Sequence, residues 1–414
     1  MTDDKIKALL ATETTPLYVY DTAVLKNRVA YLKAQLPERV SLCYAMKANA
    51  FIIKALEGQV DYFEICSPGE YRICENVGLP RESYVISGVN KSQALIEELV
   101  NGETLPNCLT VESLHHFHMI REAAHKARRR VPVLLRVTTS SQFGLDKADL
   151  CSLVAEYQAD EWLDIVGIQH FSGTQKTSLK KVARELKSVD ALIRELAEDY
   201  HFEVKKLEYG GGFPVAYFEG ETFDEEAYLA GFSDLLSEMS YQGPIVLELG
   251  RSIAASCGTY LTGVVDVKYN DGVHYAIVDG GMHQMNYFGQ FMAMKMPAMH
   301  LVGAKKRLAD ADNAADPDNA GLEAGSDGTD TRQPWHICGS LCTTNDILVK
   351  QAMLPDLAIG DVLAFENTGA YSVTEGMALF LSRDLPAVIL ANENGVFKKV
   401  RDHIEIADLN TPQL

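Results

Sequence analysis

Short apolar runs alternate with amphipathic stretches between about residue 40 and residue 250, and this alternation constrains the fold more than any other feature of the chain. Strand-like runs begin at Val40, Tyr62, Tyr84, Cys108, Val131, Ile165, Lys206 and Ile245. Between them lie helix-like segments such as SLKKVARELKSVDALIRELAEDY, whose apolar residues recur at helical spacing. About eight successive β-then-α units predict a (β/α)8 barrel, that is, a TIM-like α/β fold.

The character of the sequence changes after Gly250. Runs such as GTYLTGVVDVKY and PAVILANENG are rich in β-favouring residues and are separated by turn residues. We therefore expect a barrel domain over residues 26–250 and an all-β C-terminal domain, a β-barrel or sandwich, over residues 251–414. The strand-like LYVYD near the N-terminus assigns residues 1–25 to the β domain. A chain of 414 residues is long enough to build two cores.

Residues 309–332 fit neither domain. The segment is rich in Asp, Gly and Ala and holds few large apolar residues, so it cannot contribute much to a packed core. We predict a mobile acidic surface loop, and the sequence leaves its role open.

Composition excludes several function classes. The net charge of -19 argues against a nucleic-acid binder, which needs a basic surface. No apolar run approaches the roughly 20 residues that span a bilayer, and the acidic N-terminus lacks the apolar core of a signal peptide. The cysteines are scattered and complete no zinc-site spacing. We expect a cytoplasmic enzyme with reduced thiols, no metal and no membrane partner.

A lysine ends one strand-like run, where a barrel carries its chemistry. Lys47 lies in the motif YAMKANA, directly after the run that starts at Val40. Such a lysine either extends its amine into water or holds it in a desolvated site, where a lowered pKa suits Schiff-base chemistry. The motif by itself leaves both interpretations open.

Two further motifs end later strand-like runs. The glycines of YGGGFPVAYF, Gly210–Gly212, let backbone N–H groups approach an anion, or they form a tight turn. In ELGRSIAASCG, Glu248 and Arg251 flank Gly250. These two charges either pair with each other or face the ring nitrogen and the phosphate of one ligand.

The β-rich half contributes CGSLCTTNDIL, with Cys342, and ENTGAYSVTEG, with Tyr371. Taken alone, these residues are most simply an inert cysteine and a core tyrosine. Taken with YAMKANA, the glycine run and ELGR, their order and spacing resemble the fold-type III decarboxylases that use pyridoxal 5'-phosphate (PLP), the group of the diaminopimelate and ornithine decarboxylases. The resemblance extends over nearly the whole chain.

This resemblance implies a PLP-dependent decarboxylase that works as a homodimer with shared active sites on an amino acid or a derivative of one. Lys47 would form the Schiff base, and Glu248 would pair with the pyridine nitrogen. Cys342, reaching in from the second subunit, would donate a proton to the substrate carbon. The same motifs assign the phosphate and its surroundings to Thr174, Gly211, Gly212, Gly250, Arg251 and Tyr371.

Departures from the best-known members bear on the substrate. Thr343 follows Cys342 where those members carry an acidic residue that contacts the distal amine of the substrate. The segment VDGGMHQMNYFGQ lacks the arginine that diaminopimelate decarboxylases use for the distal carboxylate. Both differences disfavour diaminopimelate as the substrate and leave Thr343 as a candidate substrate contact.

A third departure concerns the residue that stacks on the PLP ring, usually a histidine. The motif HFSGTQ puts Phe171 at that position and His170 one residue earlier. Because neighbouring strand residues point to opposite faces, we predict Phe171 as the stacking group. A local bulge would turn His170 to the ring instead.

The segments GGGFPVAYFEGE, VDGGMHQM and SLCTTNDIL resemble a branch that includes glutamyl-carrier-protein and exosortase-associated decarboxylases. We therefore expect a substrate that is carrier-bound or otherwise derivatised. Two alternatives stay open. A PLP-dependent racemase would interconvert D and L forms without CO2 release, although a carboxylate at the ring nitrogen favours decarboxylation. The second alternative is a non-catalytic PLP-binding protein, against which the presence of Cys342 alongside Lys47 counts, because cofactor storage needs no general acid.

Overall fold

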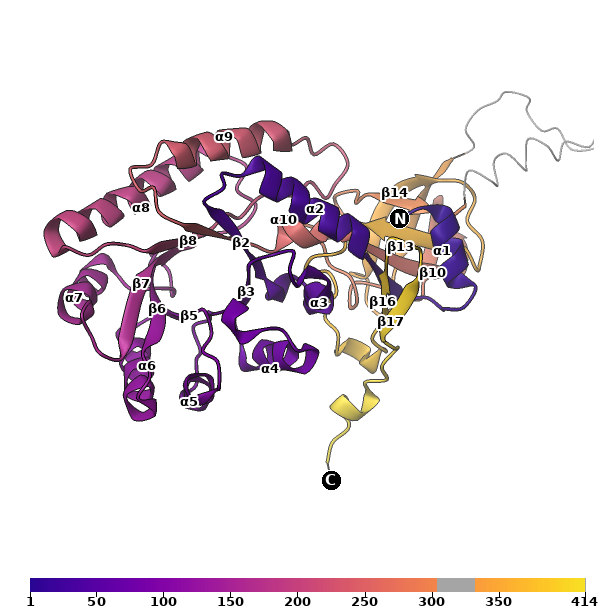
Figure 1. Ribbon diagram of the computed structural model, residues 1–414. Helices are drawn as coiled ribbons and strands as arrows, with labels where there is room; N and C mark the ends of the chain where they lie inside the picture. The colour runs from indigo at the N-terminus through magenta and orange to yellow at the C-terminus, as the bar shows by residue number, and fades with distance from the viewer. Residues whose placement is uncertain (304–331, 414) are drawn as a thin grey trace, which may run out of the picture. The chain divides into compact units, whose positions relative to one another are not determined.

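The computed structural model describes residues 1–303 and 332–413. The described chain forms two compact units, which are drawn in Figure 1. The barrel unit comprises residues 24–216 and 222–254. The β unit comprises residues 1–23, 217–221 and the described residues from 255 onward. Most of the predicted acidic loop, residues 309–331, lies outside the described residues.

The barrel unit contains a closed parallel barrel whose strands follow one another in chain order. The strands are β2 (Val40–Ala45), β3 (Tyr62–Ile65), β4 (Tyr84–Ile86), β5 (Cys108–Val111), β6 (Val131–Val137), β7 (Leu163–His170), β8 (Lys206–Gly210) and β9 (Ile245–Leu249). Strand β9 closes the ring on β2, with Glu248 opposite Cys43. The predicted TIM-like barrel is confirmed, because every strand-like run of the sequence forms one of these strands.

Helices surround the barrel strands (Figure 1). They are α2 (Thr22–Gln35), α3 (Ile53–Leu56), α4 (Pro68–Val77), α5 (Gln93–Asn101), α6 (Leu114–Ala127), α7 (Lys147–Tyr157), α8 (Leu179–Tyr200), α9 (Glu225–Ser237) and the short α10 (Arg251–Ala254). Several begin at a side chain that accepts a hydrogen bond from the first turn: Ser67, Ser92, Ser113, Asp146 and Asp224. These N-caps set where the helices start.

Alternation along the strands divides the barrel into an inner and an outer face. The inner face holds an apolar cluster made of Cys43, Val85, Cys108, Leu134 and Val246. The outer face packs against the helices; α8, for example, buries residues spaced at helical intervals along one side. Polar side chains lie farther along the strands, towards their carboxyl ends, where barrel enzymes carry their sites.

The β unit is built on a mixed sheet. Its elements are helix α1 (Asp3–Leu10) and strands β1 (Leu17–Asp21), β10 (Gly258–Asn270), β11 (Val273–Val278), β12 (Met299–Leu301), β13 (Gln333–Cys338), β14 (Ile347–Leu354), β15 (Val362–Glu366), β16 (Ala387–Ala391) and β17 (Phe397–Arg401). The predicted N-terminal strand LYVYD is β1, which pairs with β10 and β16. The predicted combination of a barrel with a C-terminal β domain is confirmed.

One short segment between two barrel elements belongs to the β unit. Phe218 forms a bridge with Pro297, and the Glu219 N–H donates to the Met296 carbonyl at 2.8 Å. Residues 217–221 therefore leave the barrel unit, although the sequence places them inside the span 26–250.

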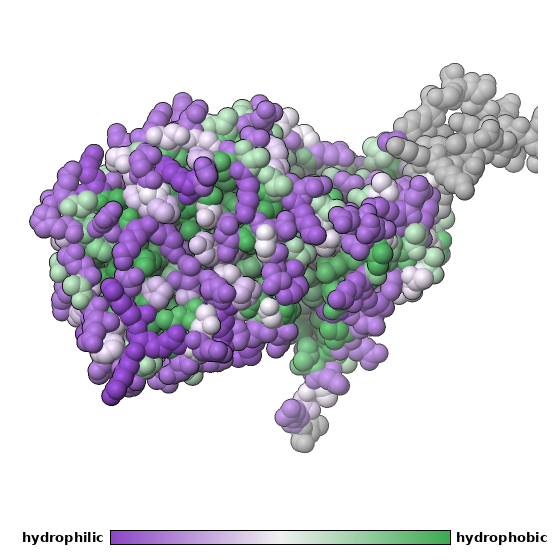
Figure 2. Space-filling model, viewed as in Figure 1, coloured by the Kyte–Doolittle hydropathy of each residue, from purple (hydrophilic) through white to green (hydrophobic). Residues whose placement is uncertain are grey.

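The visible face of the barrel unit is mainly hydrophilic (Figure 2). This matches helices such as α8, whose charged residues lie opposite its buried ones. Within residues 1–303 and 332–413, none of the helices combines the length and the apolar character needed to cross a bilayer.

Candidate active site

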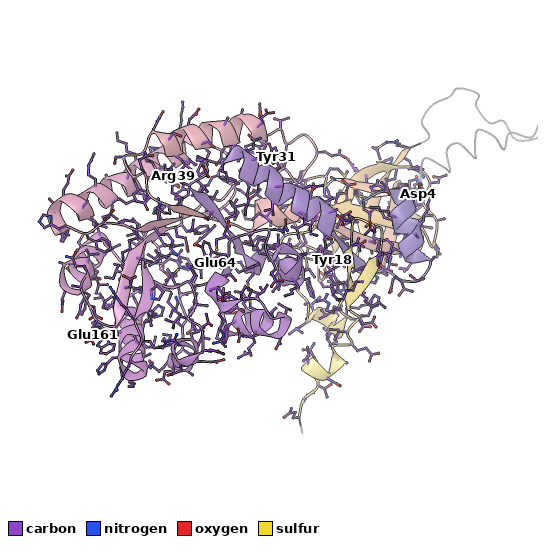
Figure 3. The ribbon with its side chains drawn as sticks, viewed as in Figure 1. Asp4, Tyr18, Tyr31, Arg39, Glu64 and Glu161 are labelled. Atoms are coloured by element: carbon purple, nitrogen blue, oxygen red, sulfur yellow. The ribbon has the colours of Figure 1, made fainter. Side chains whose placement is uncertain are left out.

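The Lys47 amine lies at the carboxyl end of β2, in a short 3-10 turn over Met46–Ala48. Its Nζ is 2.7 Å from Glu64 Oε2 and 3.6 Å from Cys66 Sγ. Glu64 lies on the neighbouring strand β3 and is labelled in Figure 3. The sequence analysis missed Glu64 and Cys66. The available signal was a carboxylate inside the apolar run YFEIC, because buried glutamates are rare unless they are paired.

The charges of this pair stabilise each other. Burial alone would lower the pKa of Lys47, but attraction to Glu64, with smaller contributions from Cys66 and Glu248, raises it well above its usual value. Burial opposes the charge on Glu64 as well, and the Lys47 ammonium still holds the pKa of that carboxyl below its usual value. Lys47 is therefore a cation at neutral pH, and its nucleophilic form requires that the proton be removed.

Replacing Glu64 with glutamine is expected to move Lys47 reactivity to lower pH. The change removes the attraction that raises the pKa and leaves the burial that lowers it, so more of the amine is unprotonated at a given pH. Acylation of Lys47 by an amine reagent, followed by mass spectrometry across pH, measures the shift.

The matched control for this prediction is Glu57→Gln, which breaks the Lys54–Glu57 pair at the same N–O distance of 2.7 Å. The two lysines are similarly exposed, Lys47 at 41% and Lys54 at 52%, but Glu57 is 37% exposed whereas Glu64 is only 6% exposed. Solvent therefore screens the Lys54–Glu57 pair more, and the labelling profile of Lys54 should hardly move. An unchanged Lys47 profile in the Glu64→Gln variant would contradict the assignment.

A second carboxylate group lies on the other side of β2. Glu248, on β9, is only 6% exposed, and its Oε1 accepts a hydrogen bond from Gln169 Nε2 at 2.9 Å. Glu208, on β8, is fully buried. Burial raises the pKa of Glu248, and the charge of Glu64 raises it further, while the hydrogen bond between Glu248 and Glu208 acts in the opposite direction. The predicted ring-nitrogen partner is thus held inside the barrel by neighbours on β7 and β8.

Three of the predicted phosphate residues meet at one edge of the barrel. The loop after β7 runs beside the glycines after β8, where the Lys176 N–H donates to the Gly212 carbonyl at 2.9 Å. Arg251, after β9, reaches the same loop, with its Nε 3.5 Å from Thr174 Oγ1. The geometry therefore brings Gly212, Thr174 and Arg251 together.

Glycine is required at two positions near this edge of the barrel, one after β8 and one after β9. Gly212 has φ +59°, a left-handed conformation that side chains disfavour, and a Cβ there would collide with the Gly173 carbonyl. At Gly250, a Cβ would lie 3.0 Å from the Cβ of Ala48, beside the Lys47 turn. The Gly211 N–H donates to the Glu248 carbonyl at 3.3 Å. The backbone at Gly250 thus lies beside the Lys47 turn, and the backbone at Gly211 lies beside Glu248.

The two candidates for ring stacking point in opposite directions. His170 stacks on Tyr209, with ring centroids 6.0 Å apart and planes at 7°, and burial lowers its pKa to about 4. Tyr209 in turn stacks on Phe232 of helix α9, so His170 faces the helices. Phe171 lies over Gly210, where any added Cβ would collide with its ring. Its ring centroid is 6.0 Å from the Arg136 guanidinium. Phe171 thus has the inward position that stacking requires.

A buried ion pair, which the sequence analysis also missed, lies near Phe171. Arg136 Nη1 is 2.6 Å from Glu112 Oε1, and the Gly144 N–H donates to Glu112 Oε2 at 3.1 Å. Lys91, also buried, donates to the Gly88 carbonyl at 2.6 Å, and burial lowers its pKa to about 8 despite attraction to Glu112. The arginine in the apolar run VPVLLRVT was the available signal.

The remaining predicted residues, Cys342, Thr343 and Tyr371, lie in the β unit. Cys342 is exposed, in a loop whose shape is set by Asp346. The carboxylate of Asp346 accepts from the Leu341 N–H and the Met282 N–H, each at 2.8 Å. Tyr371 adopts a left-handed φ of +66°, which is uncommon for a residue with a side chain.

The barrel residues offer a defined combination of groups to a ligand. They provide an amine, a buried carboxylate and a glycine-lined backbone beside an arginine, all at the carboxyl ends of barrel strands. An aromatic aldehyde that carries a ring nitrogen and a phosphate would use each of these groups. Among the described residues no group of three or more His, Cys, Asp or Glu side chains is placed to hold a metal ion.

Comparison with protein families gives this combination a name. Residues 22–255 match the family model described as "Pyridoxal-dependent decarboxylase, pyridoxal binding domain". The chain belongs to the pyridoxal-dependent decarboxylases. The match covers the whole barrel and ends shortly after Arg251, so it includes every predicted site residue of the barrel unit. The predicted family, enzyme class and PLP cofactor are confirmed.

Individual relatives match almost the full length of this decarboxylase. The L-glutamyl-(BtrI acyl-carrier protein) decarboxylase of Niallia circulans is 26% identical over 99% of this chain and 96% of its own. The diaminopimelate decarboxylase of Aquifex aeolicus is 27% identical over 96% and 91%. The crystal structure of Helicobacter pylori diaminopimelate decarboxylase complexed with L-lysine, at 23% identity, has a TM-score of 0.79 and covers 98% of both chains. This structure supports the fold.

Proposed function

We propose that this decarboxylase holds PLP through Lys47, with Glu248 at the ring nitrogen and the loop of Thr174, Gly212 and Arg251 at the phosphate. The main support is that Lys47 lies in the turn directly after β2 and Glu248 lies on the adjacent strand β9, with Cys43 of β2 directly opposite Glu248. When bound, PLP accepts the electron pair that remains after CO2 leaves the substrate. Glu248 keeps the ring nitrogen protonated, and Phe171 covers one face of the ring.

The other proposed roles concern protons and the β unit. Glu64 holds the Lys47 ammonium when the amine is not covalently engaged, because these two groups already pair at 2.7 Å. Cys342, exposed on its loop, donates a proton to the substrate carbon, and Tyr371 contributes to the phosphate site. Both assignments rest on the motif resemblance, as does a homodimer in which Cys342 acts in the active site of the partner subunit.

The proposed substrate is an amino acid bound to a carrier protein or otherwise derivatised, with glutamate on a carrier as the first candidate. Thr343 cannot supply a negative charge for a distal ammonium group. The segment between Asp279 and Gln290 contains no arginine for a distal carboxylate. The name of the Niallia circulans relative, at 26% identity, points to the same class.

Incubating the PLP-loaded enzyme with free and carrier-linked amino acids tests this proposal, with CO2 release and product mass as readouts. We expect CO2 from a carrier-linked acidic amino acid and none from free diaminopimelate, with Lys47→Ala as the inactive control. Efficient turnover of free diaminopimelate would overturn the substrate assignment. Exchange of the substrate α-hydrogen with solvent, without CO2 release, would show that the enzyme catalyses a racemase-like reaction and not decarboxylation.

A further inference from the structure

Glu208 is a buried carboxyl group that the roles above do not use. It lies on β8, in register with Gln169 of β7, and its side chain is 0% exposed. Among the described residues, no N–H or neutral O–H group donates a hydrogen bond to either of its oxygens. A buried carboxylate without a donor would carry the full cost of desolvation, so the ionised form of Glu208 is strongly disfavoured.

Glu208 is in register with Val246 of the adjacent strand β9, and strand alternation places Glu248, two residues farther along β9, on the same inner face. Two adjacent buried carboxyl groups do not both ionise. The surroundings decide which of them keeps the proton. Glu248 accepts a hydrogen bond from Gln169 Nε2 at 2.9 Å, which stabilises its charge. Burial, followed by repulsion from Glu248 and a hydrogen bond to it, raises the pKa of Glu208 well above its usual value. The proton therefore resides on Glu208.

We propose that Glu208 is a positioning residue that remains a neutral carboxylic acid and donates its proton in a hydrogen bond to Glu248. Together with Gln169 it holds Glu248 ionised and fixes the direction of its carboxylate. The role assigned to Glu248 at the ring nitrogen rests on the proposed function. The hydrogen bond from Glu208 to Glu248 does not depend on it, because it follows from the buried side chains of this chain alone.

The consequence for the enzyme is specific. Burial and the charge of Glu64 both favour protonation of Glu248, and the donor Glu208 opposes them. Lys47 and Gln169 lower the pKa of Glu248 as well. Loss of the Glu208 donor shifts that pKa upward, towards a protonated Glu248 that cannot pair with a protonated ring nitrogen. If Glu208 only filled space, its replacement would not change the protonation of Glu248. If Glu208 acted through a negative charge, the neutral Glu208→Gln variant would lose activity.

Two variants separate these roles. Glu208→Gln keeps the size and an N–H donor but cannot hold an acidic proton. Glu208→Met keeps the approximate size and removes the donor. Glu161→Gln, an exposed glutamate far from Glu64 in Figure 3, is the matched control for the loss of a carboxyl group.

Infrared spectroscopy of the PLP-free protein at neutral pH gives the first readout. Subtracting the spectrum of Glu208→Gln from that of the unchanged protein should reveal the carbonyl band of one protonated carboxylic acid. The Glu161→Gln difference should show no such band. If the Glu208→Gln difference also lacks it, the proton lies elsewhere and the proposal is wrong. This readout needs no turnover, so it stands even if the proposed substrate fails.

The second readout is the nitrogen-15 chemical shift of labelled PLP in the loaded enzyme, which reports protonation of the ring nitrogen. We expect Glu208→Gln to keep the nitrogen protonated and kcat within a few-fold. Glu208→Met should lose that protonation and lower kcat about 10- to 100-fold, as for a lost hydrogen bond to a charged group. A Glu208→Met variant with a protonated ring nitrogen and unchanged kcat would overturn the proposal; if this variant does not fold, the infrared result for Glu208→Gln still decides.

Discussion

Replacing Cys342 with alanine is expected to lower kcat about 10²- to 10⁴-fold, the range typical of a lost general acid. In the proposed role, the Cys342 thiol donates a proton to the substrate carbon after CO2 has left, and the alanine side chain has no acidic proton to donate. Cys342 is exposed and belongs to the β unit, so its removal should leave the barrel residues and PLP binding unchanged. Steady-state CO2 release and the absorbance of bound PLP measure the two effects separately.

The control for this variant is Cys338→Ala, a second thiol in the same region, on strand β13. Cys338 is only partly buried, and no role in the reaction is assigned to it. We expect nearly unchanged kcat for this control. If Cys342→Ala retains full activity with the same product stereochemistry, another group is the proton donor.

Replacing Arg136 with methionine is expected to destabilise the barrel unit by about 3–5 kcal/mol, the usual effect of removing one partner from a buried ion pair. The side chains of Arg136 and Glu112 are 9% and 3% exposed, and their charged atoms are 2.6 Å apart. Methionine leaves Glu112 charged, buried and without its guanidinium. Urea unfolding of the PLP-free protein measures the change in the free energy of unfolding.

Two comparisons sharpen this prediction. Arg130→Met breaks an exposed pair with Asp164 and should change stability by no more than about 1 kcal/mol. The double variant Arg136→Met with Glu112→Leu should lose less free energy of unfolding than the two single variants lose together, by about 0.5–3 kcal/mol. Strict additivity of the two changes would show that the pair contributes nothing as a pair.

Much of the fold could be predicted because its signals are local. The strand-like runs from Val40 to Ile245 each form a barrel strand. Short apolar runs bounded by turn residues are typical of buried strands. The N-terminal LYVYD forms strand β1, which pairs with β10 and β16. The family was also visible, because Lys47, the glycine run and ELGR are short contiguous motifs.

The partners within the site could not be predicted in the same way. Glu64, Glu112 and Glu208 all stand in apolar runs of the sequence, but nothing in those runs shows which charge each one meets. The orientation of Phe171 and His170 followed from strand alternation, and the structure supplied the outward partner, Tyr209. The acidic loop predicted over residues 309–332 stays a prediction.

The sequence by itself determined the order of the elements, the family and the strand ends at which the site residues are predicted to lie. These follow from hydrophobic periodicity and from short motifs, both of which act over a few residues. The tertiary structure decided that Lys47 pairs with Glu64, that Arg136 pairs with Glu112 and that Glu208 lies beside Glu248. Closure of the barrel brings residues from separate strands onto one inner face. Because little solvent reaches that face, the neighbours of each ionisable group there set its protonation.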